Sequence, residues 1–377
     1  MKNNPFIYLR GLKHVSFSVF CVGKDGQKSY YDPLFNTQVP YSSGQQVKRS
    51  IIGQINDTLG VQPSPTEFYF DLDKKGKKLN EGEVLSSCDP HYVDQLLGGW
   101  MRAKKKPANK GKKKDEEEDE SEVYEKVIKR RSPSCFSAMK PLHSLLANLV
   151  KEDVTFDRSD RPNYHKVEVR YSDGKVLTDE QINDFLENNN KSLYRKWIPN
   201  QSRATGLFIN DVIIDMRRLF CVSINEYEAE VTPKVAESLK ADGWKPINTV
   251  FGECLLMPKE QREKIIPIIA DALLEWHIDS NQSRTFDTME TLAVTITDNA
   301  NILNSSIRSK ITGYYDDEET RPKVKPIVDT NVDGANTYIT LAGAGYFYTN
   351  DEDKDALKKA KKDLIDRMLA FDYENQM

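Results

Sequence analysis

The sequence predicts an α+β protein, on the basis of three observations. Segments rich in β-branched and aromatic residues alternate along the chain with segments whose apolar residues recur at helical spacing. No repeat of fixed period is visible, so a solenoid or a propeller is not expected. Long polar stretches separate several of these segments, which predicts insertions into a mixed core.

Seven segments have the character of β-strands. Residues 15–23 (VSFSVFCVG) alternate poorly between apolar and polar side chains, which is typical of a central strand buried on both faces. Residues 165–171 (HKVEVRY) alternate well, which predicts a half-exposed strand. The other strand segments are residues 67–72, 207–216, 218–224, 251–257 and 291–297.

Helical segments lie between these strands. Residues 178–189 begin with Thr178 followed by a Gln three residues later, which predicts a helix with a capping box. Residues 259–276 have the pattern of an amphipathic helix, which Pro267 should kink. Further helices are expected around residues 91–97 and 141–150.

The last helix is expected within residues 351–371, where apolar residues recur at helical spacing. The side chains that we expect to face the core are Leu357, Leu364, Met368 and Leu369.

Length and composition limit the class of protein. A chain of 377 residues can form one elaborated domain or two ordinary ones, and a mean hydropathy of −0.63 is typical of a soluble protein. No apolar run could span a bilayer and no signal peptide is visible, so we expect a cytoplasmic protein without a membrane partner. The five cysteines are widely spaced, so a disulfide framework is not expected.

The formal net charge of −4 is unevenly distributed. Residues 103–114 carry seven lysines and residues 115–125 carry eight acids, so with Lys126 this tract sums to zero. Because the tract has few apolar groups to bury, we expect residues 103–128 to form a flexible charged insertion. Either a basic arm that touches nucleic acid or a solvated loop with mutually compensating charges fits this composition.

A basic helix start is the most informative feature of the sequence. Val47, Ile51, Ile52, Ile55 and Leu59 recur at helical spacing, which predicts a helix that packs inward. Serines that favour the N-cap position precede it, and its free N–H groups should face outward beside polar and basic side chains. The predicted phosphate site comprises Ser42, Ser43, Gln45, Gln46, Lys48 and Arg49. An ordinary surface helix with two cations is the alternative interpretation.

The order of strand, Asp-Pro loop, Pro-Tyr-x-x-Gly and basic helix resembles the start of a known family. It is similar to the RAMP-superfamily backbone subunit of class 1 CRISPR-associated effector complexes of the Cascade type, which binds guide RNA and is present in several copies. Other segments that resemble this family are residues 94–101 (DQLLGGWM), 130–146, 204–223 and 281–301.

This resemblance implies a modified RRM (ferredoxin-like) core with large insertions, described in the family as palm, fingers and thumb-like elements, within a single domain over residues 1–377. It implies that the chain binds CRISPR RNA and polymerises head to tail with further copies of itself. Other CRISPR-associated subunits and a target nucleic acid strand are the remaining expected partners. The additional RNA-binding candidates are Arg130, Arg131, Arg203 and Arg284.

The sequence favours a non-catalytic scaffold over an enzyme. It contains no phosphate-binding Walker loop, no H-E-x-x-H and no G-x-S-x-G. RNA-cleaving relatives use an Asp in the loop after the first strand. Asp25 lies in that region, but Asp25-Gly26 is also a hairpin-turn signal, so Asp25 is the one weak catalytic candidate. The alternatives are a guide-dependent endoribonuclease that cleaves target RNA and a general single-stranded RNA-binding protein.

No cofactor and no metal are expected. Cys88 and His91 have the C-x-x-H spacing of zinc ligands, with Cys135 and His143 further along the chain. A second tightly spaced pair is missing, so a zinc site is the less favoured interpretation.

Overall fold

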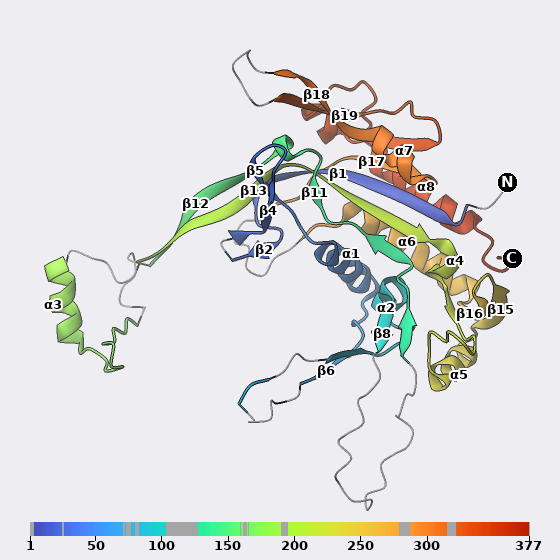
Figure 1. The fold of residues 1–377 in the computed structure, drawn as a ribbon, viewed down its shortest axis with the longest axis horizontal. Coiled ribbons are helices and arrows are strands. Elements are labelled where there is room, and N and C mark those ends of the chain that lie inside the picture. Colours follow the sequence, from blue (N-terminus) through green and yellow to red (C-terminus); the bar gives the residue numbers. More distant parts are fainter. Residues whose placement is uncertain are drawn as a thin grey trace, which may run out of the picture.

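The computed structural model describes residues 4–24, 26–70, 72, 77–79, 83–102, 127–158, 160, 164, 166–189, 195–278, 287–314 and 322–376. Figure 1 shows a body built around one large sheet, from which a long two-stranded ribbon extends on one side. Both termini lie at the opposite end of the body.

The core has the order βαββαβ. Its elements are β1 (Phe6–Ser18), α1 (Gly44–Leu59), an interrupted edge strand, β13 (Arg195–Asp215), α6 (Lys259–Glu275) and β17 (Thr291–Thr297). The interrupted strand consists of β10 (Ser134–Phe136), β11 (Lys140–Pro141) and β12 (Ala147–Asp157), which all pair antiparallel with β13.

In this sheet β1 lies between β13 and β17, and both pairs are antiparallel. The two helices connect the strands as in a ferredoxin-like split βαβ arrangement. The predicted α+β class with an RRM-like core is therefore confirmed. The sheet is extended beyond β17 by β20 (Ala335–Ile339), and β2 (Val22–Gly23) and β3 (Gly26–Gln27) join its other side through a parallel bridge to β13.

The first strand differs from the predicted 15–23. It begins at Phe6 and ends at Ser18, with a bulge between Val15 and Ser18. Arg10 and Lys13 obscure the strand in the sequence, yet both are buried: Arg10 forms an ion pair with Asp211 at 2.7 Å. Lys13 instead donates hydrogen bonds to Trp276 O at 3.0 Å and to Thr291 Oγ1 at 2.9 Å. Buried charged groups need ion-pair or hydrogen-bond partners of this kind.

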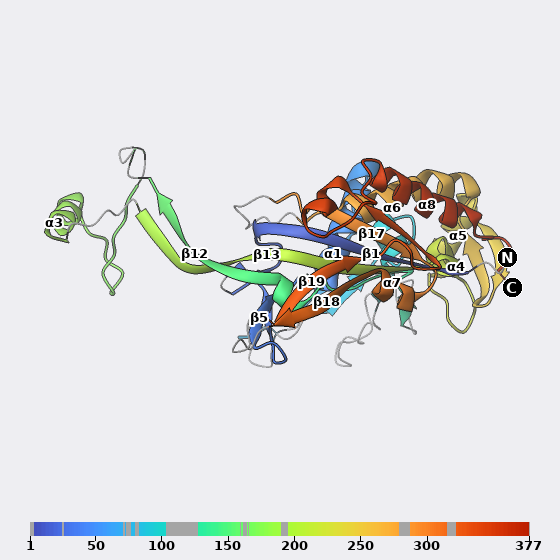
Figure 2. The same cartoon turned by 90° about the horizontal axis from the view of Figure 1, so that it is seen from above.

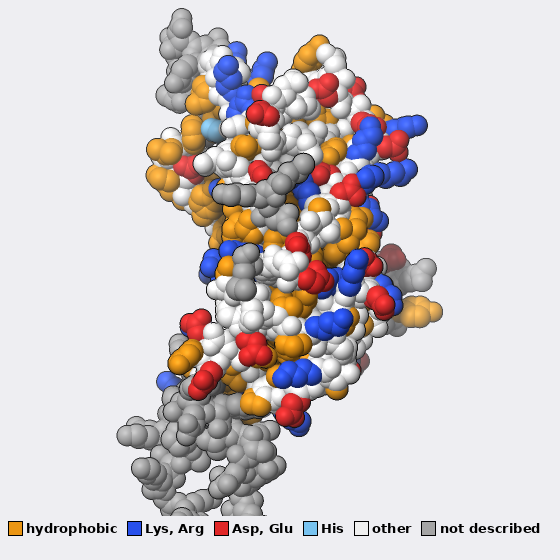
Figure 3. Space-filling model, turned by 90° about the vertical axis from the view of Figure 1, so that its right-hand side faces the viewer, with side chains coloured by type: hydrophobic (Ala, Val, Ile, Leu, Met, Phe, Trp, Pro, Cys, Tyr) orange, Lys and Arg blue, Asp and Glu red, His pale blue; other side chains and the backbone are white. Residues whose placement is uncertain are grey.

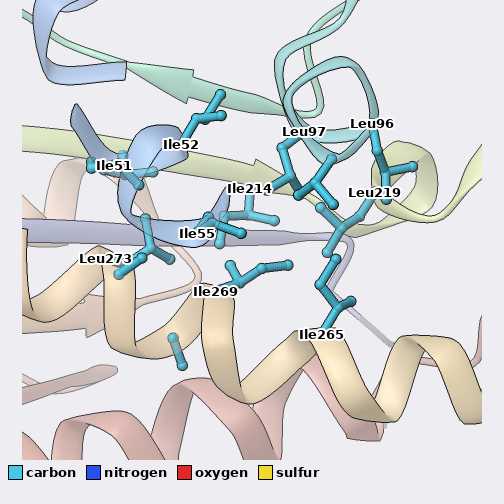
Figure 4. Packing of buried hydrophobic residues seen from close by; sticks show 14 of the residues in the cluster. Ile51, Ile52, Ile55, Leu96, Leu97, Ile214, Leu219, Ile265, Ile269 and Leu273 are labelled. Atoms are coloured by element: carbon cyan, nitrogen blue, oxygen red, sulfur yellow. The ribbon is translucent and has the colours of Figure 1, made fainter. Parts of the chain in front are cut away.

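The two faces of the sheet have separate apolar clusters. On one face, α1, α2 (Val93–Gly98), α6 and α8 (Ala356–Ala370) pack over the strands. Figure 4 shows the isoleucines and leucines of α1, α2 and α6 that interdigitate there. On the other face, Leu12, Leu207 and Ile307 form a smaller cluster beneath β18 (Ile307–Tyr314) and β19 (Pro322–Val328). Figure 2 shows α6 and α8 on one side of the strands and β18 and β19 on the other.

Two predicted helices are present. The capping box at α3 (Asp179–Asn189) is present, because the Gln181 N–H donates to Thr178 Oγ1 at 3.4 Å and Gln181 Oε1 accepts from the Thr178 N–H at 3.0 Å. The helix α6 continues through Pro267. In α8, Leu364 and Met368 are buried as expected, but Leu369 is 47% exposed, so its predicted inward orientation is wrong.

Two other predictions are wrong. The helix expected around 141–150 is β11, the 3-10 turn η2 (Ser144–Leu146) and the start of β12, because pairing with β13 imposes an extended backbone on this segment. The strand expected at 165–171 is absent from its described part. There the chain forms only an isolated bridge between Arg170 and Val176.

The remaining elements decorate this core. The outer part of β12 and β13 forms the ribbon seen in Figure 1, and α3 lies beyond it. Smaller hairpins and helices are β4 (Ser29–Asp32) with β5 (Thr37–Pro40), β6 (Thr66–Tyr69) with β7 (Glu83–Ser86), β8 (Trp100–Arg102) with β9 (Ile128–Arg130), β14 (Cys221–Ser223), β15 (Lys245–Thr249), β16 (Gly252–Leu256), α4 (Met216–Leu219), α5 (Pro233–Ala241), α7 (Ala300–Ser306) and η4 (Leu341–Gly345).

Most of the predicted 103–128 insertion lies outside the described residues, and its last residue, Ile128, begins β9. The ends of the tract are neighbours, because Arg102 in β8 pairs with Ile128. We expect replacement of residues 104–125 by a short Gly/Ser linker to change the free energy of unfolding by about 1 kcal/mol or less, since each doubling of loop length costs about 0.6 kcal/mol. Urea titration of both proteins measures this. A misfolded product would show that the tract is packed structure.

Candidate nucleic-acid interface

The N terminus of α1 is capped as the sequence predicts. Ser43 has an extended backbone (φ −66°, ψ 151°), and its Oγ accepts from the N–H of Gln46 at 3.3 Å. Within the described parts of the chain, the N–H groups of Gly44 and Gln45 donate to no acceptor. The first turn carries no acidic residue, so the positive end of the helix dipole is not neutralised locally.

The backbone of Gly44 lies against another segment of the same chain. A Cβ on Gly44 would lie 2.7 Å from the carbonyl O of Phe136 and 3.3 Å from that of Ser137. One side of the helix terminus is therefore closed by β10 and the residue after it. An external ligand can reach only the side on which Gln45 is exposed.

The predicted phosphate site is divided by burial. Ser42 is fully buried and its N–H donates to Met139 O at 2.9 Å, so it is unavailable to a ligand. Ser43 and Gln46 are partly exposed. Gln45 and Arg49 are exposed and, four residues apart, share one face of the helix.

Lys48 is partly committed to the protein. Its ammonium donates to Gly98 O at 2.5 Å, and burial lowers the pKa of this lysine. Lys48 thus links α1 to the end of α2. A ligand can interact with its ammonium only while the hydrogen bond to Gly98 O is kept. This leaves Arg49 as the most accessible cation of the predicted set on α1.

Arg130 does not fit an RNA-binding role. Its side chain is 3% exposed, and the guanidinium donates to the carbonyl groups of Leu96, Arg218 and Cys221, with the carboxylate of Glu230 at 3.6 Å. These carbonyls include the ends of α2 and α4. The planar, five-donor guanidinium therefore holds two helix C termini together inside the protein.

Arg131 is the better placed of the two neighbouring arginines. It is exposed and follows β9 directly. The backbone around it lies against Gly99, where a Cβ would be 2.5 Å from Arg130 O and 2.7 Å from Ser132 N. Gly98, which precedes Gly99, accepts the hydrogen bond from Lys48 Nζ. The backbone around Arg131 therefore passes close to the Lys48 ammonium.

The other predicted residues lie elsewhere. Arg203 is buried at the base of the ribbon and pairs with Glu152 at 2.6 Å, so its guanidinium is not offered to solvent. Arg284 and the catalytic candidate Asp25 are outside the described residues. The predicted residues that lie together at the start of α1 are therefore Ser43, Gln45, Gln46, Lys48 and Arg49, and the backbone of Arg131 passes near the contact between Lys48 and Gly98.

Sequence reasoning missed two groups of cations. Lys28 is exposed, and its Nζ lies 5.4 Å from the centre of the Tyr41 ring, two residues before the cap of α1.

Lys310 and Lys325 are exposed and directly opposite each other in the β18–β19 ribbon, an arrangement of like charges that destabilises a strand pair. Alternating basic residues in RSK (308–310) and KVK (323–325) are the signal that could have revealed the second group.

The zinc alternative has no support in the described residues. His91 Nδ1 lies 2.6 Å from Asp89 Oδ1 and its Nε2 lies 2.8 Å from Asp242 Oδ2, so both ring nitrogens are occupied. Cys88 is buried. Across the described segments, no three His, Cys, Asp or Glu side chains are grouped so that they could hold a metal ion.

The end of the molecule that carries the termini has a mixed surface. Figure 3 shows basic and acidic side chains interspersed there, with apolar groups between them. That face does not offer the continuous basic stripe typical of nucleic-acid binding. In the described parts of the chain no helix is long and apolar enough to cross a membrane.

Comparison with known proteins gives structural likenesses only. No protein-family model and no curated protein matches the chain. One similar solved chain belongs to a "CRISPR RNA-guided surveillance complex", with 11% identity and a TM-score of 0.37 over 96% of this chain and 83% of that chain. A second belongs to a "CRISPR RNA-guided surveillance complex, pre-nicking", with 9% identity and a TM-score of 0.41 over 96% and 88%. These values are too low to establish a family.

Proposed function

We propose that this protein is a CRISPR RNA-binding backbone subunit of an antiviral surveillance complex. The observation that carries the proposal is the accessible start of α1, whose first two turns present Gln45, Arg49 and free N–H groups at the edge of an RRM-like core. This chemistry suits the phosphate backbone of a single strand and leaves the bases free to pair. The order of sequence motifs around this turn supports the same assignment.

Copies of the chain would bind side by side along one guide, in a head-to-tail filament closed by other CRISPR-associated subunits. Such a contact is heterologous, so it extends until another protein ends it. The β12–β13 ribbon supports this proposal, because it extends well beyond the body and could reach a neighbouring copy or the guide–target pairing (Figure 1). We assign it as the thumb-like element.

The test of the phosphate site is Arg49→Ala. We expect RNA binding to weaken roughly tenfold for every guide sequence, since one hydrogen bond to a charged group contributes about 1.5 kcal/mol or more. The slope of log affinity against log salt should fall by about 0.7, the value for one phosphate contact on a single strand. Binding is measured by fluorescence anisotropy over a range of KCl concentrations.

Lys240→Ala is the matched control, because Lys240 is an exposed helical cation on α5, away from α1. It should leave affinity and salt slope unchanged. Equal behaviour of the two variants would contradict the assignment of the α1 terminus as the phosphate site.

A further inference from the structure

Two of the five cysteines form a buried pair. Cys221 in β14 is 3% exposed and Cys254 in β16 is 1% exposed. The two strands pair antiparallel, with Ser223 directly opposite Cys254. Side chains two residues apart in a strand lie on the same face, so Cys221 and Cys254 are diagonal neighbours on one face of the sheet. Their thiols are hydrogen-bonded to each other, which brings two nucleophilic groups together.

The surroundings of the pair make its two thiols different. The pKa of the Cys254 thiol is lowered, chiefly by the hydrogen bond from Cys221, while burial opposes this shift and a hydrogen bond from Thr249 adds to it. Thr249 Oγ1 lies 3.3 Å from Cys254 Sγ. The pKa of the Cys221 thiol is raised by its hydrogen bond to Cys254 and by burial. When the pair loses one proton, Cys254 is therefore the thiolate and Cys221 keeps its proton.

Positive charge lies beside the same pair. The Arg130 guanidinium donates to Cys221 O at 3.2 Å, and the charge of Arg218 contributes to the lowered pKa of Cys254, although Glu230 opposes it. The thiolate is the reactive form of cysteine, and cationic neighbours favour it. Cys254 thus has the environment of a reactive thiol.

The other three cysteines do not share these features. Burial raises the pKa of Cys88 to about 11. Among the described residues, neither Cys21 nor Cys135 has another cysteine as a hydrogen-bond partner. Of the five cysteines, all of which are described, the Cys221–Cys254 pair alone combines a stabilised thiolate with a second thiol that can resolve an oxidised intermediate.

The pair lies near the periphery, in a three-stranded sheet with the order β14–β16–β15. Figure 1 places β15 and β16 at the end of the body away from the β12–β13 ribbon. The turn between these two strands contains Val250, which is 58% exposed and follows Thr249 directly. Peripheral hairpins open locally at a lower free energy than a central sheet. Opening of this turn gives a molecule as small as hydrogen peroxide a path to Cys254.

We propose that Cys254 and Cys221 form an oxidative modification site whose substrate is a small hydroperoxide. The Cys254 thiolate attacks one oxygen of hydrogen peroxide, the O–O bond breaks, and the departing hydroxide takes a proton and leaves as water. The Cys221 sulfur then attacks the sulfenic sulfur of Cys254. An S–S bond forms, the S–O bond breaks, and the hydroxide leaves as a second water with the Cys221 proton. Two electrons thereby pass from the sulfurs to the peroxide.

The position of the pair favours a reversible bond. Diagonal neighbours on antiparallel strands have Cα atoms about 7–8 Å apart, whereas disulfides prefer about 5.5–6 Å. Closing the bond therefore requires β14 to move towards β16, and the hydrogen bond from Arg130 to Cys221 O resists this movement. Strained disulfides are readily reduced by small thiols. Dithiothreitol should therefore return the oxidised pair to two thiols.

The test treats the reduced full-length protein with hydrogen peroxide, blocks the remaining thiols with iodoacetamide and maps the peptides by mass spectrometry without reductant. We expect a linked peptide pair that joins Cys221 to Cys254 and is lighter by two hydrogen atoms than the separate peptides. In Cys221→Ala, oxidation should stop at a sulfenic acid on Cys254, which dimedone traps. Cys254→Ala should give neither product. Cys135→Ala, which removes an exposed thiol, is the control and should retain the linked pair.

Two results would overturn the modification site. One is a linked pair that forms only after unfolding in urea, which would mean that peroxide does not reach the native thiols. The other is oxidation confined to Cys135 while Cys221 and Cys254 remain free thiols. Neither measurement involves RNA, so loss of the proposed function and loss of this modification site are distinguishable.

Discussion

Arg130→Met should destabilise the folded protein by about 3–5 kcal/mol, the range found when one member of a buried ionic network is removed. The guanidinium donates to carbonyl groups of Leu96 and Cys221 that lie inside the protein, and methionine offers them no donor. Glu230 would keep Arg218 as a partner at 2.9 Å, so the largest loss comes from the unsatisfied helix ends.

Arg131→Met provides the comparison, since this neighbouring arginine is exposed. Surface substitutions of this kind change stability by about 0.5 kcal/mol or less. Urea midpoints of the two variants measure the difference. Equal midpoints would mean that Arg130 is not part of a buried network, and would return it to the set of RNA-binding candidates.

The second large effect concerns Lys13, whose ammonium is enclosed by Trp276 O at 3.0 Å and Thr291 Oγ1 at 2.9 Å. Burial lowers the pKa of Lys13 from 10.5 to about 7, although Asp287 and Glu275 oppose the shift. Between these values the unfolded chain binds more protons than the folded one, so stability rises with pH from about 7 to about 10. Below pH 7, Lys13 is protonated in both the folded and the unfolded state, so the stability gained at higher pH is lost.

At about 1.4 kcal/mol per pKa unit, the rise is on the order of 5 kcal/mol. The free energy of unfolding, measured in urea at pH 7, 8.5 and 10, should increase for the natural protein relative to Lys13→Met by that amount. The variant lacks the titrating group, so it supplies the baseline for all other ionisations. If the free energy of unfolding changed with pH equally in the natural protein and in Lys13→Met, Lys13 would be solvated or permanently paired.

Local signals in the sequence were sufficient for elements that are stabilised locally. The α1 start at Ser43, the capping box at Thr178 and the long apolar pattern of α6 each depend on residues within a turn or two. The α+β class followed from these elements. Pairing between distant segments was not accessible in the same way, which is why the segment after Lys140 was predicted as a helix although β13 pairs with it.

The candidate site was predicted in composition but not in exposure. Residue type indicated a phosphate site, yet two of its predicted members are buried. Ser42 is buried against Met139 and Arg203 is paired with Glu152, and each partner lies more than fifty residues away along the chain. Burial of Arg10 and Lys13 likewise depends on partners that no local pattern identifies. Lys28 was overlooked because a lone lysine in a loop has no distinguishing pattern, and only its contact with Tyr41 places it beside α1.

The RNA that copurifies with the protein from its native host tests the central claim most directly. A guide-binding backbone subunit should retain RNAs of narrow length distribution that share a repeat-derived handle and differ in their remaining sequence. Sequencing of the RNA extracted after purification at moderate salt measures this. Recovery of unrelated cellular RNAs without a shared handle, or of no RNA at all, would contradict the account.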